Sequence, residues 1–340
     1  MRVLVIGDGH SQIHEVAVAN ALKSLDHEVR SLFWHSYFEE SNVVRRIFKR
    51  IQNKFLIGPA IKDINQDIVK EAIKFKPNLI FIYRGTHVYH DTISSLKALM
   101  PGCFIFGYNN DDPFSKGHSP FLWRHFLRSI PKYDLMFAYR RHNIKDYLNN
   151  GAVASKILMP WFIPGKDEPL NVPIRNDVIF VGHYENDARL NYLETLSKTS
   201  YDFKLFGPDW DKAPDLPFIA KYRPIIPLVG NKYREEICAS RIALCFLSTL
   251  NRDEYTRRCF EIPAMKVFML CQYSEELANI FREDIDVVFF RNPKEMINKI
   301  KFYLDHTDIR NKIAESGYQR IISGGHDIVS RMRYVCNFIN

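Results

Sequence analysis

The sequence lacks any apolar run approaching about 18 residues, the length that a membrane-spanning helix needs. It begins with only six residues of apolar strand before an acidic turn, too short a stretch for a secretory signal peptide. It has no Cys-x-x-Cys pair, and its six cysteines lie scattered in mostly apolar segments. These absences exclude a membrane span and favour buried, reduced thiols over disulfides or a metal site. We therefore expect a soluble, cytoplasmic protein.

The composition is that of a folded globular protein. Hydrophobic residues make up 46% of the chain and charged residues 25%, which excludes a disordered or collagen-like chain. The 340 residues exceed what one hydrophobic core usually organises, so two domains of about 150 residues each are expected. The net charge of +8 is modest, and where the cations gather matters more than their excess.

Short apolar runs alternate with amphipathic, helical stretches along both halves of the chain. A proline-rich stretch from Ile157 to Pro173 interrupts the pattern, which restarts at Asp177. Continuous buried strands joined by helices predict parallel sheets with right-handed crossovers. We therefore predict an α/β fold of two tandem, doubly wound, Rossmann-like domains, residues 1–165 and 166–326, with a C-terminal helix at 327–340 that returns to the first domain.

The two domains are expected to face each other across a central cleft, at the carboxyl ends of both sheets. Ligands of open α/β sheets bind just outside those strand ends. Candidate sites are therefore sought in the turns that lead from a strand into the following helix.

The most informative turn, in the second domain, is a polar loop followed by a helix predicted to begin near residue 255 or 256. The unpaired N–H groups of a helix N-terminus suit phosphate, and Arg257 and Arg258 in the first turn make sense if a polyanion binds there. Glu261 is placed to accept two ribose hydroxyls, and Asp253 to reach a sugar beyond the phosphates. The pattern predicts a nucleoside-diphosphate sugar site. On charge spacing alone, a solvated loop and a helix with ordinary ion pairs is the favoured alternative.

The same segment carries a longer motif. Residues 255–264 read Tyr-Thr-Arg-Arg-Cys-Phe-Glu-Ile-Pro-Ala. This resembles the Tyr-Thr-x-Arg-x-Phe-Glu-Ile-Pro-Ala core of the group 1 glycosyltransferases of the GT-B fold, most closely their spore-maturation-protein (CgeB)-like branch. The resemblance covers the second domain well, and the first mainly through its layout and the Asn-Asn-Asp-Asp-Pro run at 109–113.

The resemblance implies a sugar transfer from a nucleoside-diphosphate sugar to a hydroxyl acceptor in cell-surface glycan or glycoconjugate biosynthesis. It implies a metal-independent mechanism and suggests retention of the anomeric configuration. The second domain would bind the nucleotide sugar and the first would lie on the acceptor side. The family's two acids eight positions apart fall on Asp253 and Glu261. The implied site residues are Asp253 and Arg258 for catalysis, and Glu261, Arg257, Thr256, Tyr255, Arg189 and Gly182 for the nucleotide.

In the first domain, His10 and Asp111 are the acceptor-side candidates. His10 follows the first predicted strand in a turn that is not a Gly-x-Gly-x-x-Gly fingerprint, because Gln12 occupies the last glycine position. Asp111 or Asp112 follows another strand and could orient or deprotonate an acceptor hydroxyl. The alternatives are an ordinary turn histidine and a helix cap.

We predict no metal and no cofactor, since the nucleotide sugar is a substrate. Two Asp-x-Asp triplets, at 209–211 and 284–286, match the metal-binding triplet of GT-A enzymes, but the tandem-domain layout is wrong for that fold. Turn acids explain both triplets better.

Residues 42–54 hold five cations and no acid, together with apolar residues at helical spacing. Such a helix suits an anionic membrane surface and an acceptor attached to a lipid, which would place the protein at the inner face of the membrane. The alternative is a peripheral helix that packs its apolar stripe on the sheet. Nucleic-acid binding is disfavoured because no known module accompanies the basic stretch.

The sequence leaves two other functions open. One is a nucleotide-sugar epimerase or hydrolase on the same fold. The other is a non-catalytic spore-coat or cell-surface assembly protein that has lost turnover.

Overall fold

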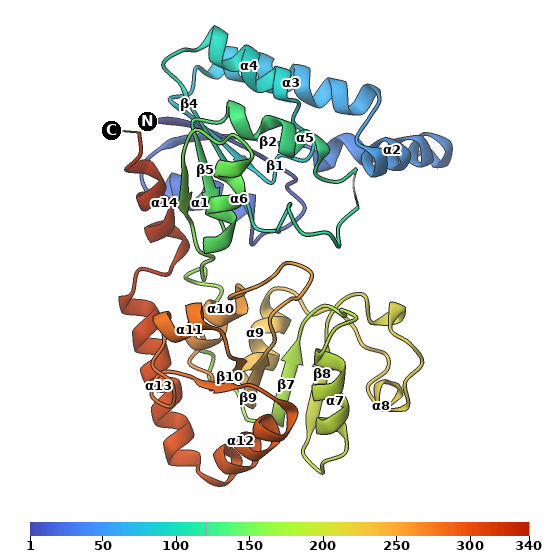
Figure 1. Cartoon of the computed structure of the whole chain (residues 1–340), viewed down its shortest axis with the longest axis vertical. Helices are drawn as coiled ribbons and strands as arrows, with labels where there is room; N and C mark the ends of the chain where they lie inside the picture. Colours follow the sequence, from blue (N-terminus) through green and yellow to red (C-terminus); the bar gives the residue numbers. More distant parts are fainter. Residues whose placement is uncertain (120, 340) are drawn as a thin grey trace. The chain divides into compact units, whose positions relative to one another are not determined.

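The computed structural model describes residues 1–119 and 121–339. The chain divides into two compact units (Figure 1). Unit 1 comprises Met1–Met159 with Ile328–Asn340, and unit 2 comprises Pro160–Asp327.

Unit 1 is built on a six-stranded parallel sheet with the order β2-β1-β3-β4-β5-β6. The central strands are almost wholly buried, which is why they read as continuous apolar runs. The strands are β1 (Arg2–Gly7), β2 (Glu28–Phe33), β3 (Leu79–Tyr83), β4 (Phe104–Asn109), β5 (Leu135–Ala138) and β6 (Ser155–Ile157).

Helices cover this sheet, and the last helix of the chain, α14, is part of unit 1. α14 packs against α1, and the Tyr334 ring contacts the Phe137 ring of β5. The helices of unit 1 are α1 (Glu15–Ser24), α2 (Val43–Phe55), α3 (Pro59–Phe75), α4 (His90–Leu99), α5 (Arg124–Ser129), α6 (Arg141–Asn149) and α14 (Ile328–Cys336).

Unit 2 has a five-stranded parallel sheet with the order β11-β10-β9-β7-β8. Its strands are β7 (Asn176–Val181), β8 (Phe203–Phe206), β9 (Ser240–Cys245), β10 (Met269–Gln272) and β11 (Val288–Phe290). Its helices are α7 (Arg189–Ser197), α8 (Pro217–Ala220), α9 (Asn231–Cys238), α10 (Arg258–Ala264), α11 (Glu275–Ile280), α12 (Pro293–Asp305) and α13 (Thr307–Ser323).

Two parallel, helix-covered sheets confirm the predicted α/β fold class. The helix predicted to begin near residue 255 or 256 begins instead at Arg258. Residues before it form a turn in which the Cys259 N–H bonds the Thr256 carbonyl and the Phe260 N–H bonds the Arg257 carbonyl. Tyr255, wholly buried, lies outside the helix.

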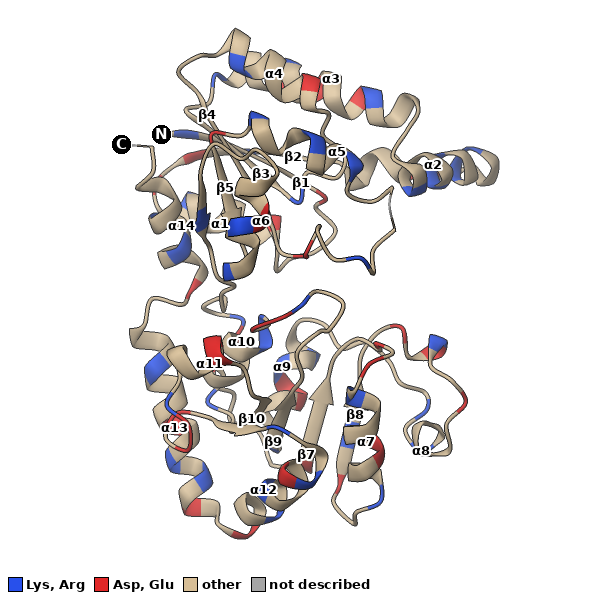
Figure 2. Cartoon of the chain, viewed as in Figure 1, with Lys and Arg blue, Asp and Glu red and all other residues tan. Residues whose placement is uncertain are grey.

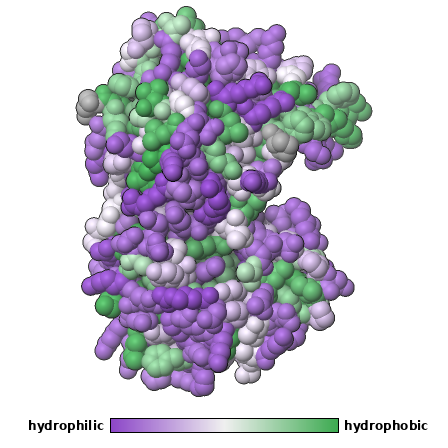
Figure 3. All heavy atoms as spheres, viewed as in Figure 1, coloured by the Kyte–Doolittle hydropathy of each residue, from purple (hydrophilic) through white to green (hydrophobic). Residues whose placement is uncertain are grey.

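The basic helix predicted at 42–54 is α2, and it does not pack its apolar stripe on the sheet. All residues of α2 are described and none is buried. Blue cationic residues run along it (Figure 2), and hydrophobic atoms gather over it in the space-filling view (Figure 3). The alternative of a core-facing stripe is therefore wrong.

Candidate functional site

The residues singled out in the second domain gather around α10 and the loop before it. This loop follows β9, and the turn between β7 and α7 lies beside it. Strands β7 and β9 are direct neighbours in the parallel sheet, so the segments that follow them meet at the same edge.

Glu261 is the buried acid of α10, with 6% of its surface exposed. Its Oε1 lies 2.9 Å from Arg257 Nη2, and its Oε2 accepts a hydrogen bond of 3.2 Å from the Tyr233 hydroxyl on α9. Arg257 also donates to Asp167 Oδ2 at 2.8 Å and to the Trp161 carbonyl at 3.1 Å. A buried carboxylate needs such partners, because desolvation of a lone charge is costly.

Arg257 and Arg258 each keep one buried donor for which the described residues offer no acceptor. These donors are Nη1 of Arg257 and Nε of Arg258. A buried guanidinium N–H without an acceptor costs free energy, and an anion with several oxygens would satisfy both groups. Guanidinium donors can bind phosphate oxygens, and a neighbouring carboxylate can accept hydrogen bonds from sugar hydroxyls; a nucleoside diphosphate presents both kinds of group.

Burial raises the pKa of Glu261 to about 7, although Arg257, Arg258 and the Tyr233 hydroxyl all act in the opposite direction. Between pH 4.5 and about 7 the folded protein therefore holds a proton that the unfolded chain has lost. The free energy of unfolding should fall as the pH rises through this window, by up to about 3 kcal/mol from this group.

Denaturant unfolding from about pH 5 to about pH 8 checks this prediction, with Glu261→Gln compared against the unmodified protein. Burial also raises the pKa of Glu15, but that contribution is common to both proteins and cancels in the difference. A parallel pH dependence in the two proteins would show that Glu261 is ionised throughout.

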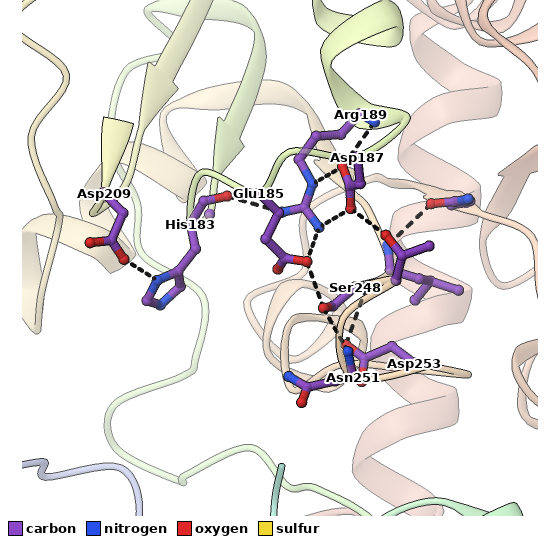
Figure 4. A network of polar contacts seen from close by, with 12 residues as sticks. His183, Glu185, Asp187, Arg189, Asp209, Ser248, Asn251 and Asp253 are labelled. Atoms are coloured by element: carbon purple, nitrogen blue, oxygen red, sulfur yellow. Dashed lines mark hydrogen bonds and ion pairs between the residues drawn. The ribbon is translucent and has the colours of Figure 1, made fainter. Parts of the chain in front are cut away.

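The loop carrying Asp253 is closed on itself and tied to the neighbouring turn (Figure 4). The Asp253 N–H donates to the Ser248 carbonyl at 2.8 Å, and Asp253 Oδ2 accepts from the Ser248 N–H at 3.3 Å. The Ser248 hydroxyl in turn donates to Glu185 at 2.6 Å. Asp253 thus shapes the loop, and its predicted contact with the sugar stays a prediction.

Arg189 is buried, with 3% of its surface exposed, and acidic partners surround its guanidinium. Nε and Nη2 bind the two Asp187 oxygens at 2.7 and 2.9 Å, Nη2 lies 3.1 Å from Glu185, and Nη1 donates to the His183 carbonyl at 2.9 Å (Figure 4). In this structure Arg189 holds the β7–α7 turn in shape. Its predicted phosphate contact stays a prediction. Such a contact would require the Arg189 guanidinium to give up a hydrogen bond to Asp187, Glu185 or the His183 carbonyl.

Gly182 directly follows β7, at a point where a side chain has no room. A Cβ there would lie 2.5 Å from the Phe180 ring, and the Gly182 carbonyl accepts a hydrogen bond of 2.9 Å from Trp210 Nε1. Packing within unit 2 alone therefore explains this glycine. Its predicted contact with the nucleotide stays a prediction.

Tyr255 and Thr256 lie beneath the loop rather than on its surface. Tyr255 packs edge-on against the Phe260 ring, and Thr256 Oγ1 lies 3.7 Å from the Cys245 sulfur. Both side chains support the residues around them here, and a direct nucleotide contact by either stays a prediction.

Three buried cysteines meet in unit 2, one each from β9, α10 and β10. Cys245 Sγ lies 3.6 Å from Cys259 Sγ, which lies 3.9 Å from Cys271 Sγ. All six cysteines are described and are free thiols. Sulfur ligands of a tetrahedral zinc ion stand about 3.8 Å apart, so this trio is the donor set in unit 2 that could hold a soft metal ion.

In unit 1, His10 and Asp111 both follow strands of the central sheet, β1 and β4, which flank β3. His10 is half exposed and pairs with Asp8. Asp111 lies 2.7 Å from Arg84 Nη2, whereas Asp112 is fully buried and accepts from Asn143 Nδ2 at 3.0 Å. Between the two aspartates, Asp111 is the one that solvent reaches, and its acceptor-side role stays a prediction.

The sequence pattern missed three residues that belong to these clusters. Asp167 lies in the proline-rich stretch, where no periodicity marks it, and Tyr233 reaches Glu261 from a separate helix. Arg84 follows β3 with a left-handed backbone, and its Nε is buried without an acceptor among the described residues. A cation directly after a buried strand was the available signal for Arg84.

Comparisons with known proteins agree with this architecture. Residues 189–337 match the family model described as Glycosyl transferase-like. HepE of Anabaena, solved with UDP-glucose, matches with a TM-score of 0.69 and 14% identity, over 100% of this chain and 99% of that one. A glycosyltransferase from Rickettsia africae matches with a TM-score of 0.67 and 16% identity, over 99% and 97%.

Sucrose-phosphate synthase of Thermosynechococcus elongatus matches with a TM-score of 0.68 and 8% identity, over 99% of this chain and 98% of that one. A comparison with curated protein sequences finds no match. The predicted tandem fold is thus confirmed over the whole chain: it is the GT-B fold, and residues 189–337 form its glycosyl transferase-like segment.

Proposed function

We propose that the protein is a glycosyltransferase that moves a sugar from a nucleoside-diphosphate sugar to a hydroxyl acceptor. The observation that carries this proposal is the cluster on α10, where the buried Glu261 carboxylate adjoins buried donors of Arg257 and Arg258 that have no acceptor among the described residues. The glycosyl transferase-like segment includes all three residues.

In this proposal each charged group meets one part of the donor. Glu261 accepts hydrogen bonds from ribose hydroxyls, and Arg257 and Arg258 hold the diphosphate. When the bond to the sugar breaks, negative charge develops on the departing phosphate, and preorganised guanidinium groups stabilise it. These two cations supply the charge that the leaving group needs, so we propose a metal-independent reaction. Asp253 contacts the sugar, and retention of its configuration is part of the same proposal.

On the acceptor side, we propose that His10 and Asp111 border the incoming hydroxyl. Their solvent access and their positions after β1 and β4 support this assignment. The acceptor is proposed to be lipid-linked, with residues 42–54 at the membrane surface. Membership of the spore-maturation-protein (CgeB)-like branch and a role in cell-surface glycan or glycoconjugate biosynthesis belong to the same proposal.

The first donor to test is UDP-glucose, because the structural neighbour HepE was solved with UDP and with UDP-glucose. Isothermal titration with a panel of nucleotides should show binding of a nucleoside diphosphate. An assay of the matching nucleotide sugar with hydroxyl acceptors should then show transfer. Failure of every nucleotide to bind contradicts the proposal and supports an assembly role. Free sugar or an isomerised nucleotide sugar as the sole product contradicts it in favour of a hydrolase or an epimerase.

A further inference from the structure

Helix α2 carries an apolar stripe that faces away from the protein body. Figure 1 shows the helix extending from unit 1, and Figure 3 shows hydrophobic atoms over it. Between 48% and 63% of the surface of each large apolar residue in the stripe is exposed. These residues are Val43, Val44, Ile47, Phe48 and Ile51.

The polar side of α2 is the side that holds it to unit 1. Lys49 Nζ donates to the Glu39 carbonyl at 3.1 Å, Gln52 Oε1 accepts from the Ala60 N–H at 2.8 Å, and Asn53 Oδ1 lies 2.8 Å from His87 Nε2. A surface helix of a globular protein normally turns its apolar stripe to the core. Here that orientation is reversed, so the stripe is available to an outside partner.

The helix is held firmly at both ends. The Asn42 side chain accepts from the Arg45 N–H at its N-terminus. At its C-terminus, Arg124 Nη2 donates to the carbonyls of Phe55 and Leu56, both at 2.7 Å. The exposed stripe therefore lies on a helix whose two ends are capped by hydrogen bonds, and not on a frayed segment.

Cations flank the stripe on both sides. At about 100° per residue, the five apolar side chains fall within an arc of about 140°. Arg45 lies beyond one edge of this arc and Arg50 beyond the other, while Lys54 falls just inside the edge next to Arg50; all three are exposed. Residues 42–54 contain no acid. Long cationic side chains beside an apolar stripe can reach headgroups while the stripe enters the acyl boundary.

We infer that α2 docks on an anionic lipid bilayer, lying in the plane of the interface with its apolar stripe inserted. Among the described residues no helix is both long and apolar enough to cross a membrane. A second copy of the chain fits this surface poorly, because two α2 helices packed stripe to stripe would bring their cations together. The inference extends the proposed function, since it would bring the enzyme to a lipid-linked acceptor.

Co-sedimentation with lipid vesicles tests the docking without any activity readout. We expect the protein to bind vesicles that contain phosphatidylglycerol at least about tenfold more tightly than vesicles of phosphatidylcholine alone. Ile47→Ser combined with Phe48→Ser should lower this binding at least about tenfold, and so should Arg45→Gln combined with Arg50→Gln, which removes one cation from each side of the stripe. Raised salt should weaken binding to the anionic vesicles.

Matched control variants lie at the far end of α3. Ile73→Ser removes another apolar side chain that is 48% exposed, and Lys74→Gln removes an exposed cation, and both should bind vesicles normally. Titration of all variants with UDP separates this inference from the proposed function, because α2 lies outside the donor site. Equal pelleting of the Ile47/Phe48 variant and the unmodified protein would overturn the docking. The docking would also be overturned if the unmodified protein were a dimer through α2 and this variant became a monomer with unchanged vesicle binding.

Discussion

Glu261→Gln is expected to lower the affinity for the donor nucleotide about 10- to 100-fold at about pH 8, where the Glu261 carboxyl, with its pKa of about 7, is ionised. The carboxylate is buried and is held in place by Arg257 and the Tyr233 hydroxyl. A hydrogen bond to a charged group contributes about 1.5–3 kcal/mol, and each 1.4 kcal/mol is tenfold in affinity. Glutamine has almost the same shape, so Tyr233 and the surrounding core can remain in place while the charge is removed.

Titration with UDP and with its deoxyribose analogue assigns this loss to the ribose. The unmodified protein should bind the deoxyribose analogue more weakly than UDP, and Glu261→Gln should bind the two almost equally. Glu315→Gln, a change at a half-exposed acid of α13, is the control and should leave both affinities unchanged. A loss of less than about twofold in Glu261→Gln would remove the ribose assignment.

Arg258→Lys is expected to lower kcat for sugar transfer about 100-fold while the affinity for the donor falls much less. Lysine keeps the positive charge but lacks the Nε donor that is buried without an acceptor among the described residues. Loss of one preorganised donor to a developing negative charge typically costs a factor of about 100 to 1,000 in rate. The contact strengthens as the diphosphate leaves, so the transition state loses more than the bound substrate.

Steady-state kinetics of transfer, together with titration of UDP and uridine, measure the two effects separately. The variant should lose part of the extra affinity that UDP has over uridine, and uridine binding should be unaffected. Arg282→Lys, at an exposed arginine of the same unit, is the matched control and should retain full activity. An equal fall in kcat and in uridine affinity would point to a collapsed site rather than to a lost phosphate contact.

The fold could be predicted from the sequence because buried parallel strands appear in it as continuous apolar runs. Runs such as Val3–Ile6 and Leu79–Ile82 are apolar on both faces, and the helices between them are amphipathic. The start of α10 was predicted two or three residues too early. Residue preferences for helix ends do not distinguish the first helical turn from the turn that residues 256–260 form.

The candidate site could be predicted only in part. Arg257 and Glu261 stand four residues apart, so helical geometry places them together, and the two form an ion pair. Tyr233 and Asp167 reach Glu261 and Arg257 through tertiary contacts that no local spacing encodes. Arg189 looked available for phosphate, although the acids two and four residues before it signalled the ion pairs that occupy it.

The sequence also left the orientation of α2 open. Its apolar spacing fits a stripe turned inward or outward equally well, because a helical period does not say what lies opposite. The structure decides this through Lys49, Gln52 and Asn53, which attach the polar side to unit 1.

A crystal structure of the protein with UDP tests the central claim most directly. The account predicts phosphate oxygens within about 3 Å of Arg257 Nη1 or Arg258 Nε, and a ribose hydroxyl hydrogen-bonded to Glu261. A nucleotide bound to other residues of either unit, with these guanidinium groups and this carboxylate untouched, would contradict it.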